Sequence, residues 1–217
     1  MSRGEIVAVE GVCCAGKTTL IGSLSRNFKT TVVPELPAFG RNLFRPFDGK
    51  ESILHNGYTS IGLEKVRMVG ALGLSGLSDQ VLMDRSIIST LAINYGAIDI
   101  IGAPAFSELA HAVLSEIENG KLATPDKMLY IGVNGQVIEE RNESRTPRLE
   151  PYWTNSKRVD RQNDFYQHLV GLDGIAYIDG ARPHTEVLSD CSAYIVHDDV
   201  MCTEALTAQI ENFVKLV

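Results

Sequence analysis

One octapeptide constrains the fold of this chain more than any other stretch, Gly11-Val12-Cys13-Cys14-Ala15-Gly16-Lys17-Thr18, because it fits the pattern G-x-x-x-x-G-K-[ST]. The β-branched run at 5–10 before it predicts a buried strand, and the leucine and isoleucine spacing of 17–26 after it predicts a helix. A glycine-bounded loop between a strand and a helix surrounds an anion with backbone N–H groups and the positive end of the helix. The order of elements therefore predicts a phosphate-binding loop (Walker A motif) rather than a chance match.

The residues of this loop divide the chemistry of phosphate binding among them. Lys17 supplies a positive charge for the β- and γ-phosphates of a nucleotide, and the Thr18 hydroxyl is a ligand for Mg²⁺. We expect the whole loop, together with the next residue, Thr19, to contact the nucleotide.

Acidic and basic residues follow two further predicted strands at the point where each strand ends. The second strand, 30–33, stops at Pro34-Glu35-Leu36-Pro37, and the third, 80–84, ends in Asp84 and is followed by Arg85. Ligands bind at the carboxyl edge of an open α/β sheet, so we expect Glu35, Asp84 and Arg85 to meet the loop at one crevice. Asp84 would reach Mg²⁺ or its waters. The alternative for Glu35 is a solvated loop glutamate.

The remaining sequence alternates strand and helix patterns. Two more strands are predicted at 127–133 and 174–179, and helices are predicted at 59–77, 86–95, 105–120, 136–142 and 203–217. This alternation predicts a single α/β domain over 1–217, with five parallel strands in a three-layer P-loop fold and helices on both faces. Residues 38–58 are expected to form an irregular connection, and the pattern of residues 181–202 assigns no element there, with room for a small extra one.

Two candidate residues for binding a substrate are less specific. Phe39 lies with other aromatic residues in the irregular stretch, where it would line a pocket for a planar ring or serve as a core anchor. Arg67 lies on the predicted helix 59–77, where a lone arginine is usually solvated surface.

The densest basic stretch is a proline-interrupted segment at about 141–161, which carries Arg141, Arg145, Arg148, Lys157, Arg158 and Arg161. A run of charges is usually a solvated face. Here a chain with a formal net charge of −7 concentrates its arginines beside a predicted phosphate site. We therefore favour an arginine-rich lid that grips an anion.

Charge and cysteine content exclude several classes of protein. The acidic balance argues against binding of duplex nucleic acid, which depends on phosphate neutralisation. The four cysteines have neither zinc-site nor disulfide-framework spacing, which favours a reduced, cytoplasmic protein. No apolar run is long enough to span a bilayer, and residues 1–5 lack the apolar segment of a signal peptide.

Taken together and in order, these motifs resemble those of the thymidylate kinase and deoxynucleoside kinase superfamily. The matching stretches are Glu10-Gly11 with the loop, Asp84-Arg85-Ser86, Ser89-Thr90-Leu91-Ala92 followed by Asn94, Pro125-Asp126, Leu129-Tyr130-Ile131, the lid residues Arg141, Arg145, Arg148 and Glu150, and Ile178-Asp179-Gly180. The resemblance covers most of residues 5–180.

The resemblance implies ATP- and Mg²⁺-dependent phosphoryl transfer to a nucleoside, a nucleoside monophosphate or a related small molecule. The implied catalytic residues are Lys17, Glu35, Asp84, Arg85, Arg145 and Arg148. Arg141 and Asp179 would join the phosphate loop in binding ATP, and Glu35, Phe39, Arg67, Arg85 and Asn94 would contact the acceptor. Mg²⁺ would be served by Thr18 and Asp84, and a homodimer is an open possibility.

Three departures from the family pattern leave the acceptor open. Cys13 and Cys14 replace other residues in the loop, no arginine precedes Glu35, and Asn94 is shorter than the family's glutamine. The alternative function is a P-loop ATPase or nucleotide-sensing regulator without a small-molecule acceptor.

Overall fold

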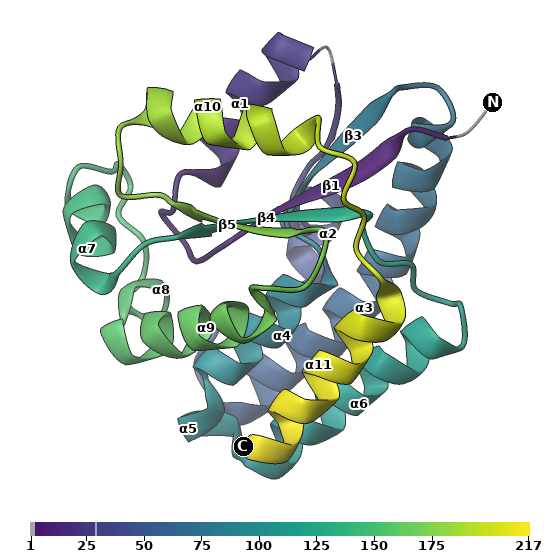
Figure 1. The fold of residues 1–217 in the computed structure, drawn as a ribbon. Helices are drawn as coiled ribbons and strands as arrows, with labels where there is room; N and C mark the ends of the chain where they lie inside the picture. The colour runs from purple at the N-terminus through teal and green to yellow at the C-terminus, as the bar shows by residue number, and fades with distance from the viewer. Residues whose placement is uncertain (1–2, 29) are drawn as a thin grey trace.

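Five parallel strands form one central sheet in the order β2-β3-β1-β4-β5 (Figure 1). Their bounds are β1 Glu5–Glu10, β2 Thr31–Val33, β3 Gln80–Asp84, β4 Lys127–Gly132 and β5 Ile175–Asp179. The structure is a computed structural model, and it describes residues 3–28 and 30–217. The five-stranded parallel sheet expected from the sequence is confirmed.

Helices cover both faces of the sheet (Figure 1). One face carries α1 Lys17–Phe28 and α10 His184–Ile195, and the other carries α3 Lys50–Ser75, α4 Ile87–Gly96, α6 Ala103–Glu118, α9 Ser156–Leu169 and α11 Thr203–Leu216. Shorter helical segments are α2 Pro37–Gly40, η1 Arg41–Leu43, α5 Ile98–Ile101, α7 Gly135–Glu143 and α8 Pro151–Thr154.

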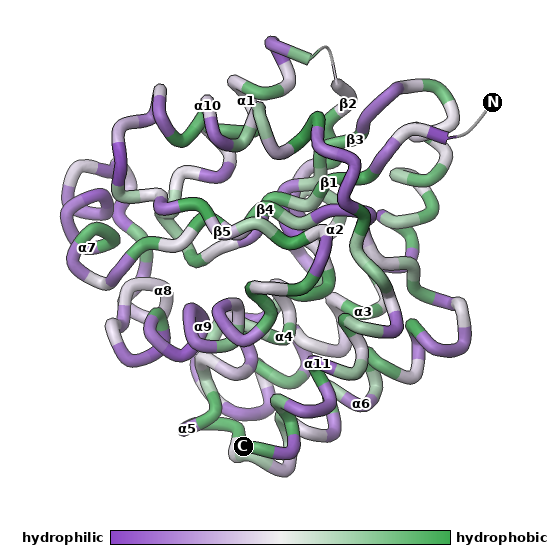
Figure 2. Tube along the Cα trace, in the orientation of Figure 1, coloured by the Kyte–Doolittle hydropathy of each residue, from purple (hydrophilic) through white to green (hydrophobic). Residues whose placement is uncertain are grey.

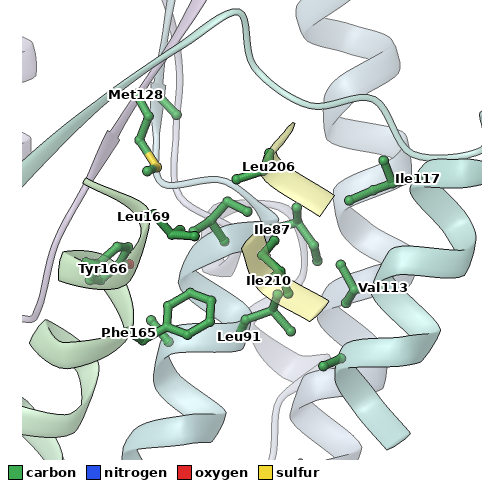
Figure 3. Close-up of a cluster of buried hydrophobic side chains, with 14 of the residues drawn as sticks. Ile87, Leu91, Val113, Ile117, Met128, Phe165, Tyr166, Leu169, Leu206 and Ile210 are labelled. Carbon is green, nitrogen blue, oxygen red and sulfur yellow. The ribbon is translucent and has the colours of Figure 1, made fainter. Parts of the chain in front are cut away.

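The central strands β1, β3 and β4 are buried on both faces, as parallel sheets require, because helices cover them from either side. The larger core cluster lies under α4, α6, α9 and α11, where Leu91, Val113, Phe165 and Ile210 pack together (Figure 3). Figure 2 shows hydrophobic residues concentrated along the strands and hydrophilic residues along much of α7. The core thus fixes the strands whose ends carry the site.

Helix boundaries show where the sequence prediction was wrong. Helix α3 begins at Lys50, so the stretch 50–58 that was expected to be irregular is helical. The buried face of this part of α3 includes Ile53, Asn56 and Ser60, and its glycines and polar residues do not show the apolar spacing by which a helix is predicted. The predicted lid contains α8 and the start of α9, which is mostly polar and buries only a narrow face. Residues 181–202 hold the 12-residue helix α10, whose Val187, Cys191 and Ile195 recur at helical spacing.

No helix in the described ranges has the length and apolarity needed to cross a membrane. The expectation about the first five residues falls partly on Met1 and Ser2, which lie outside the described residues.

Candidate active site

The phosphate loop connects β1 to α1 and is shaped by two glycines with positive φ. Gly11 has φ 138°, and a Cβ there would lie 2.4 Å from the carbonyl oxygen of Ile131 on β4. Gly16 has φ 95°, and Cys14 adopts φ 60°, a left-handed conformation that is uncommon for residues other than glycine. The loop therefore passes so close to β4 that only glycine fits at its start.

Lys17 begins helix α1 and is 6% exposed. Its Nζ donates a hydrogen bond to the carbonyl oxygen of Val12, 2.8 Å away, so the side chain folds back over the loop. Burial, followed by repulsion from the Arg85 guanidinium, lowers the pKa of Lys17 to about 8. The lysine charge is thus held at the loop with little solvation of its own.

Thr18 and Asp84 form the part of the site suited to a divalent cation. Thr18 Oγ1 donates to Asp84 Oδ2 at 2.9 Å, and the buried Asp84 Oδ1 has no hydrogen-bond partner. Among the described residues, no cluster of three His, Cys, Asp or Glu side chains could hold a metal alone. One hydroxyl and one carboxylate beside a phosphate loop match Mg²⁺, which takes few protein ligands and shares phosphate oxygens. The residues therefore fit Mg²⁺ bound together with a nucleotide.

Arg85 joins the phosphate loop to the end of β2. It is 7% exposed, and its Nη1 donates to the Gly11 carbonyl oxygen at 2.8 Å and to Ser89 Oγ at 3.1 Å. Its Nε donates to Glu35 Oε1, and its Nη2 lies 3.7 Å from Cys13 Sγ. Glu35, Arg85 and the loop are therefore brought together, as the strand-end argument predicts.

The Arg85–Glu35 pair keeps both side chains ionised. Burial lowers the pKa of Arg85, but the facing Glu35 carboxylate and, behind it, Cys13, Tyr166 and Glu10 together raise it by more, so the net shift is upward. Burial alone would raise the pKa of Glu35, yet the Arg85 and Lys17 charges hold it below its usual range. Glu35, whose side chain is 44% exposed, thus presents a carboxylate at the edge of the crevice.

Arg67 lies in an environment different from the one expected for an acceptor contact. It is 1% exposed, and its guanidinium donates to the carbonyl oxygens of Pro34 and Asp84, at 3.2 and 3.1 Å, and of Arg85. Its charge is paired with Glu64, whose Oε2 lies 3.0 Å from Nε. Burial raises the pKa of Glu64 to about 7 in spite of this partner. Arg67 therefore contacts the backbone that carries the site residues, and its role toward an acceptor stays a prediction.

Two other predicted acceptor residues lie outside the Arg85 network in the described part of the chain. Asn94 is buried in α4, where its Nδ2 donates to the Thr90 carbonyl oxygen at 2.8 Å and its Oδ1 has no partner. Phe39 lies on α2 and is 47% exposed. Their contacts with an acceptor stay predictions as well.

Arg141 ties the other side of the loop to the end of β5. Its Nη1 donates to the carbonyl oxygens of Cys14 and Ala15, each at 3.1 Å, and its Nη2 to that of Gly180 at 2.6 Å. Asp179 Oδ1 accepts from the Ala181 N–H at 2.9 Å and so shapes the turn after β5. A cavity of about 70 Å³ lies here, with Arg182 and His184 also in its lining, two residues that no sequence motif marked.

Two other arginines of the predicted lid, Arg145 and Arg148, lie between α7 and α8 and are exposed. Neither side chain makes an ion pair or hydrogen bond with another described residue. Thr19 is exposed on α1 beside the loop. Their catalytic and binding roles stay predictions.

Sequence reasoning missed a buried polar network behind the loop. Glu10 is fully buried, and its carboxylate accepts from the N–H and Oγ of Ser86, both at 2.6 Å, from Ser89 Oγ, and from the Tyr166 hydroxyl at 3.1 Å. The only available signal was an acidic residue inside an otherwise apolar strand, next to the loop. Burying a carboxylate costs free energy unless the group is hydrogen-bonded, so such a residue indicates a surrounding network of hydrogen-bond donors.

Comparison with known proteins supports the fold. No protein-family model and no curated protein matches the chain. Three solved structures of deoxyadenosine kinase from M. mycoides do match in structure. The structure with the products dCMP and a flexible dCDP has a TM-score of 0.67 at 16% identity, over 87% of this chain and 97% of that chain.

The dCTP-bound structure has a TM-score of 0.68 at 15% identity, over 87% of this chain and 97% of that chain. The dATP-bound structure has a TM-score of 0.64 at 15% identity, over 88% of this chain and 100% of that chain. The α/β fold expected from the motifs is thus confirmed, because these solved structures share it over 87–88% of this chain. At this identity the likeness concerns the fold.

Proposed function

We propose that this chain is an ATP- and Mg²⁺-dependent phosphotransferase that acts on a nucleoside, a nucleoside monophosphate or a related small molecule. The observation that carries the proposal is the convergence of Lys17, Thr18, Asp84, Arg85 and Glu35 at the carboxyl edge of a kinase-like sheet. Phosphoryl transfer needs positioning and charge neutralisation more than covalent chemistry by the protein. These five side chains supply both.

Each residue has a distinct task in the proposed reaction. Lys17 and the loop N–H groups bind the donor phosphates, and Thr18 with Asp84 would hold Mg²⁺. When bound, Mg²⁺ neutralises charge that develops on the phosphate oxygens. Arg85 orients the acceptor oxygen or its phosphate, and Glu35 accepts a proton where the acceptor is a hydroxyl. The ionised state of Glu35 supports that last role.

On the donor side, Arg141 and the turn at Asp179 would contact the nucleotide base and phosphates. We further propose that the segment 141–161 is a lid, in which Arg145 and Arg148 reach the transferring phosphoryl group. Their free guanidinium groups support this, because they have no partner among the described residues. A cytoplasmic protein that binds no nucleic acid, and a homodimeric state, remain expectations from composition and resemblance.

A screen of ATP consumption tests the proposal directly. Purified protein with Mg-ATP is supplied with nucleosides, nucleoside monophosphates and small hydroxylated metabolites, and Lys17→Ala serves as the inactive control. We expect acceptor-dependent ADP release that disappears in the variant. Slow hydrolysis that no acceptor stimulates would contradict a kinase and favour the P-loop ATPase or regulator.

A further inference from the structure

The turn between β3 and α4 has an unusual backbone at its central residue. Arg85 has φ 69°, in the left-handed region that side chains other than glycine, asparagine and aspartate seldom occupy. Such a conformation persists when the surroundings determine it, and it is often found at functional sites. Here it directs the Arg85 guanidinium toward Glu35 and the phosphate loop.

On one side of this turn, Arg67 of α3 binds its carbonyl oxygens. Nη1 contacts the Asp84 oxygen at 3.1 Å, and Nη2 contacts the Arg85 oxygen. The Glu64 carboxylate balances the buried charge from the same helix. Charge-assisted hydrogen bonds of this kind are stronger than neutral ones, particularly where water is excluded.

On the other side, Glu10 of β1 binds the N–H group that follows Arg85. Its Oε1 accepts from the Ser86 N–H and Oγ at 2.6 Å, and its Oε2 accepts from Ser89 Oγ. Ser89 Oγ in turn lies 3.1 Å from Arg85 Nη1, so Glu10 reaches the Arg85 side chain through one hydroxyl. The peptide groups of the turn are thus held from both sides.

We propose that Glu10 and Arg67 are positioning residues that hold Arg85 in its left-handed conformation and so aim its guanidinium at the reacting groups. The inference rests on the proposed function, in which Arg85 contacts the acceptor. Tyr166 of α9 binds Glu10 as well, at 3.1 Å, so the same carboxylate joins the turn to the helix that follows the lid. Neither Glu10 nor Arg67 touches the acceptor in this role.

Two measurements test the proposal, one with turnover and one without. The first compares kcat and the KM for ATP in Glu10→Gln, Arg85→Lys and the double variant, with Tyr130→Phe as the matched control. Tyr130→Phe keeps the ring that stacks on Tyr166 and removes only the hydrogen bond of 2.7 Å from the Tyr130 hydroxyl on β4 to Asn163 on α9, a bond that involves neither Glu10 nor Arg85.

If Glu10 acts through Arg85, the single variant Glu10→Gln should have a kcat about tenfold lower than the native protein, with a KM for ATP near normal. When Arg85→Lys is already present, adding Glu10→Gln should lower kcat by less than about twofold. Arg67→Lys should follow the same pattern, and Tyr130→Phe should leave kcat unchanged. An equal loss from Glu10→Gln in both backgrounds would overturn the proposal, because a general loss of structure does not depend on Arg85.

The second measurement is amide hydrogen exchange over residues 84–89, which needs no substrate. Glu10→Gln should accelerate exchange there by about tenfold, while Tyr130→Phe should not. An unchanged exchange rate in a folded Glu10→Gln variant would refute the proposal that Glu10 holds the turn at Arg85. If Glu10→Gln does not fold, Ser89→Ala, which keeps the carboxylate but cuts its link to Arg85, takes its place in both assays. If no acceptor supports turnover, the proposed function fails, and exchange still decides the role of Glu10.

Discussion

The affinity for Mg-ATP should fall as the pH rises through the pKa of Lys17. Burial and the Arg85 charge lower that pKa to about 8 in the free protein. The phosphates of a bound nucleotide favour the charged lysine, so binding should raise the pKa and take up a proton. Below pH 7 the lysine is already charged, and the affinity should be constant.

The size of the effect follows from the fraction of charged lysine. At pH 9, about one tenth of the side chains retain the proton, so the dissociation constant should be about tenfold higher than at pH 7. The same shift affects stability. The pKa of Lys17 in the folded protein lies below its ordinary value of 10.5, so between about pH 8 and pH 10.5 the unfolded state binds more protons than the folded state. The free energy of unfolding should therefore rise with pH in that window, by up to about 3 kcal/mol.

Isothermal titration of a non-hydrolysable ATP analogue, in buffers of different ionisation enthalpy, measures affinity and proton uptake together. Lys17→Met removes the titrating group, and its weaker binding should be independent of pH between 7 and 9. A Cys13→Ser/Cys14→Ser variant tests whether the two thiols of the loop contribute to the pH dependence. A pH-independent affinity in the native protein, or a pH dependence that persists in Lys17→Met, would refute the reasoning.

Three further predictions concern the acceptor, the thiols and the lid. Glu35→Gln should lower kcat by about 10²–10⁴-fold with little change in KM if the acceptor is a hydroxyl, because the general base is lost, whereas near-normal kcat would indicate an acceptor that is already anionic. At least one of Cys13 and Cys14 should react with iodoacetamide, and saturating Mg-ATP should slow the labelling because the nucleotide phosphates would cover the loop; equal rates with and without nucleotide would place both thiols away from it. Trypsin should cut after Arg145 or Arg148, which are exposed between α7 and α8, and a bisubstrate analogue should slow the cut; cleavage at the same rate in both states would argue against closure of the lid.

Local sequence patterns were sufficient to predict the bounds of an element that is buried along almost its whole length. Strand β3 matches its predicted bounds, because a short apolar run ending in Asp84 fits only a buried strand in this context. The start of α3 could not be read in the same way. Its first two turns mix Gly57 and polar residues with Ile53, and the packing of α3 against α4 and α6 decides that they are helical.

The site shows a similar division. Residue types and strand ends were enough to gather Glu35, Asp84 and Arg85 at the loop. The partners of Arg67 depend on how α3 packs over the ends of β2 and β3, which no spacing within the helix reveals. Glu64, three residues before Arg67, was the one local sign that this arginine would be buried as a pair.

The strand order has a consequence for how specificity can change. Strand β1 is the middle of the sheet: β3 and β2 on one flank lead to Arg85 and Glu35, and β4 and β5 on the other lead to Arg141 and the Gly180 turn. In the proposed function, the residues for the acceptor and those for the donor therefore come from opposite flanks of β1 and meet at the phosphate loop. The segment after β2 can therefore be diversified in a library to seek new acceptor preferences, while the turn after β3 is kept, because its Asp84 and Arg85 bond to Thr18 and Gly11 of the loop.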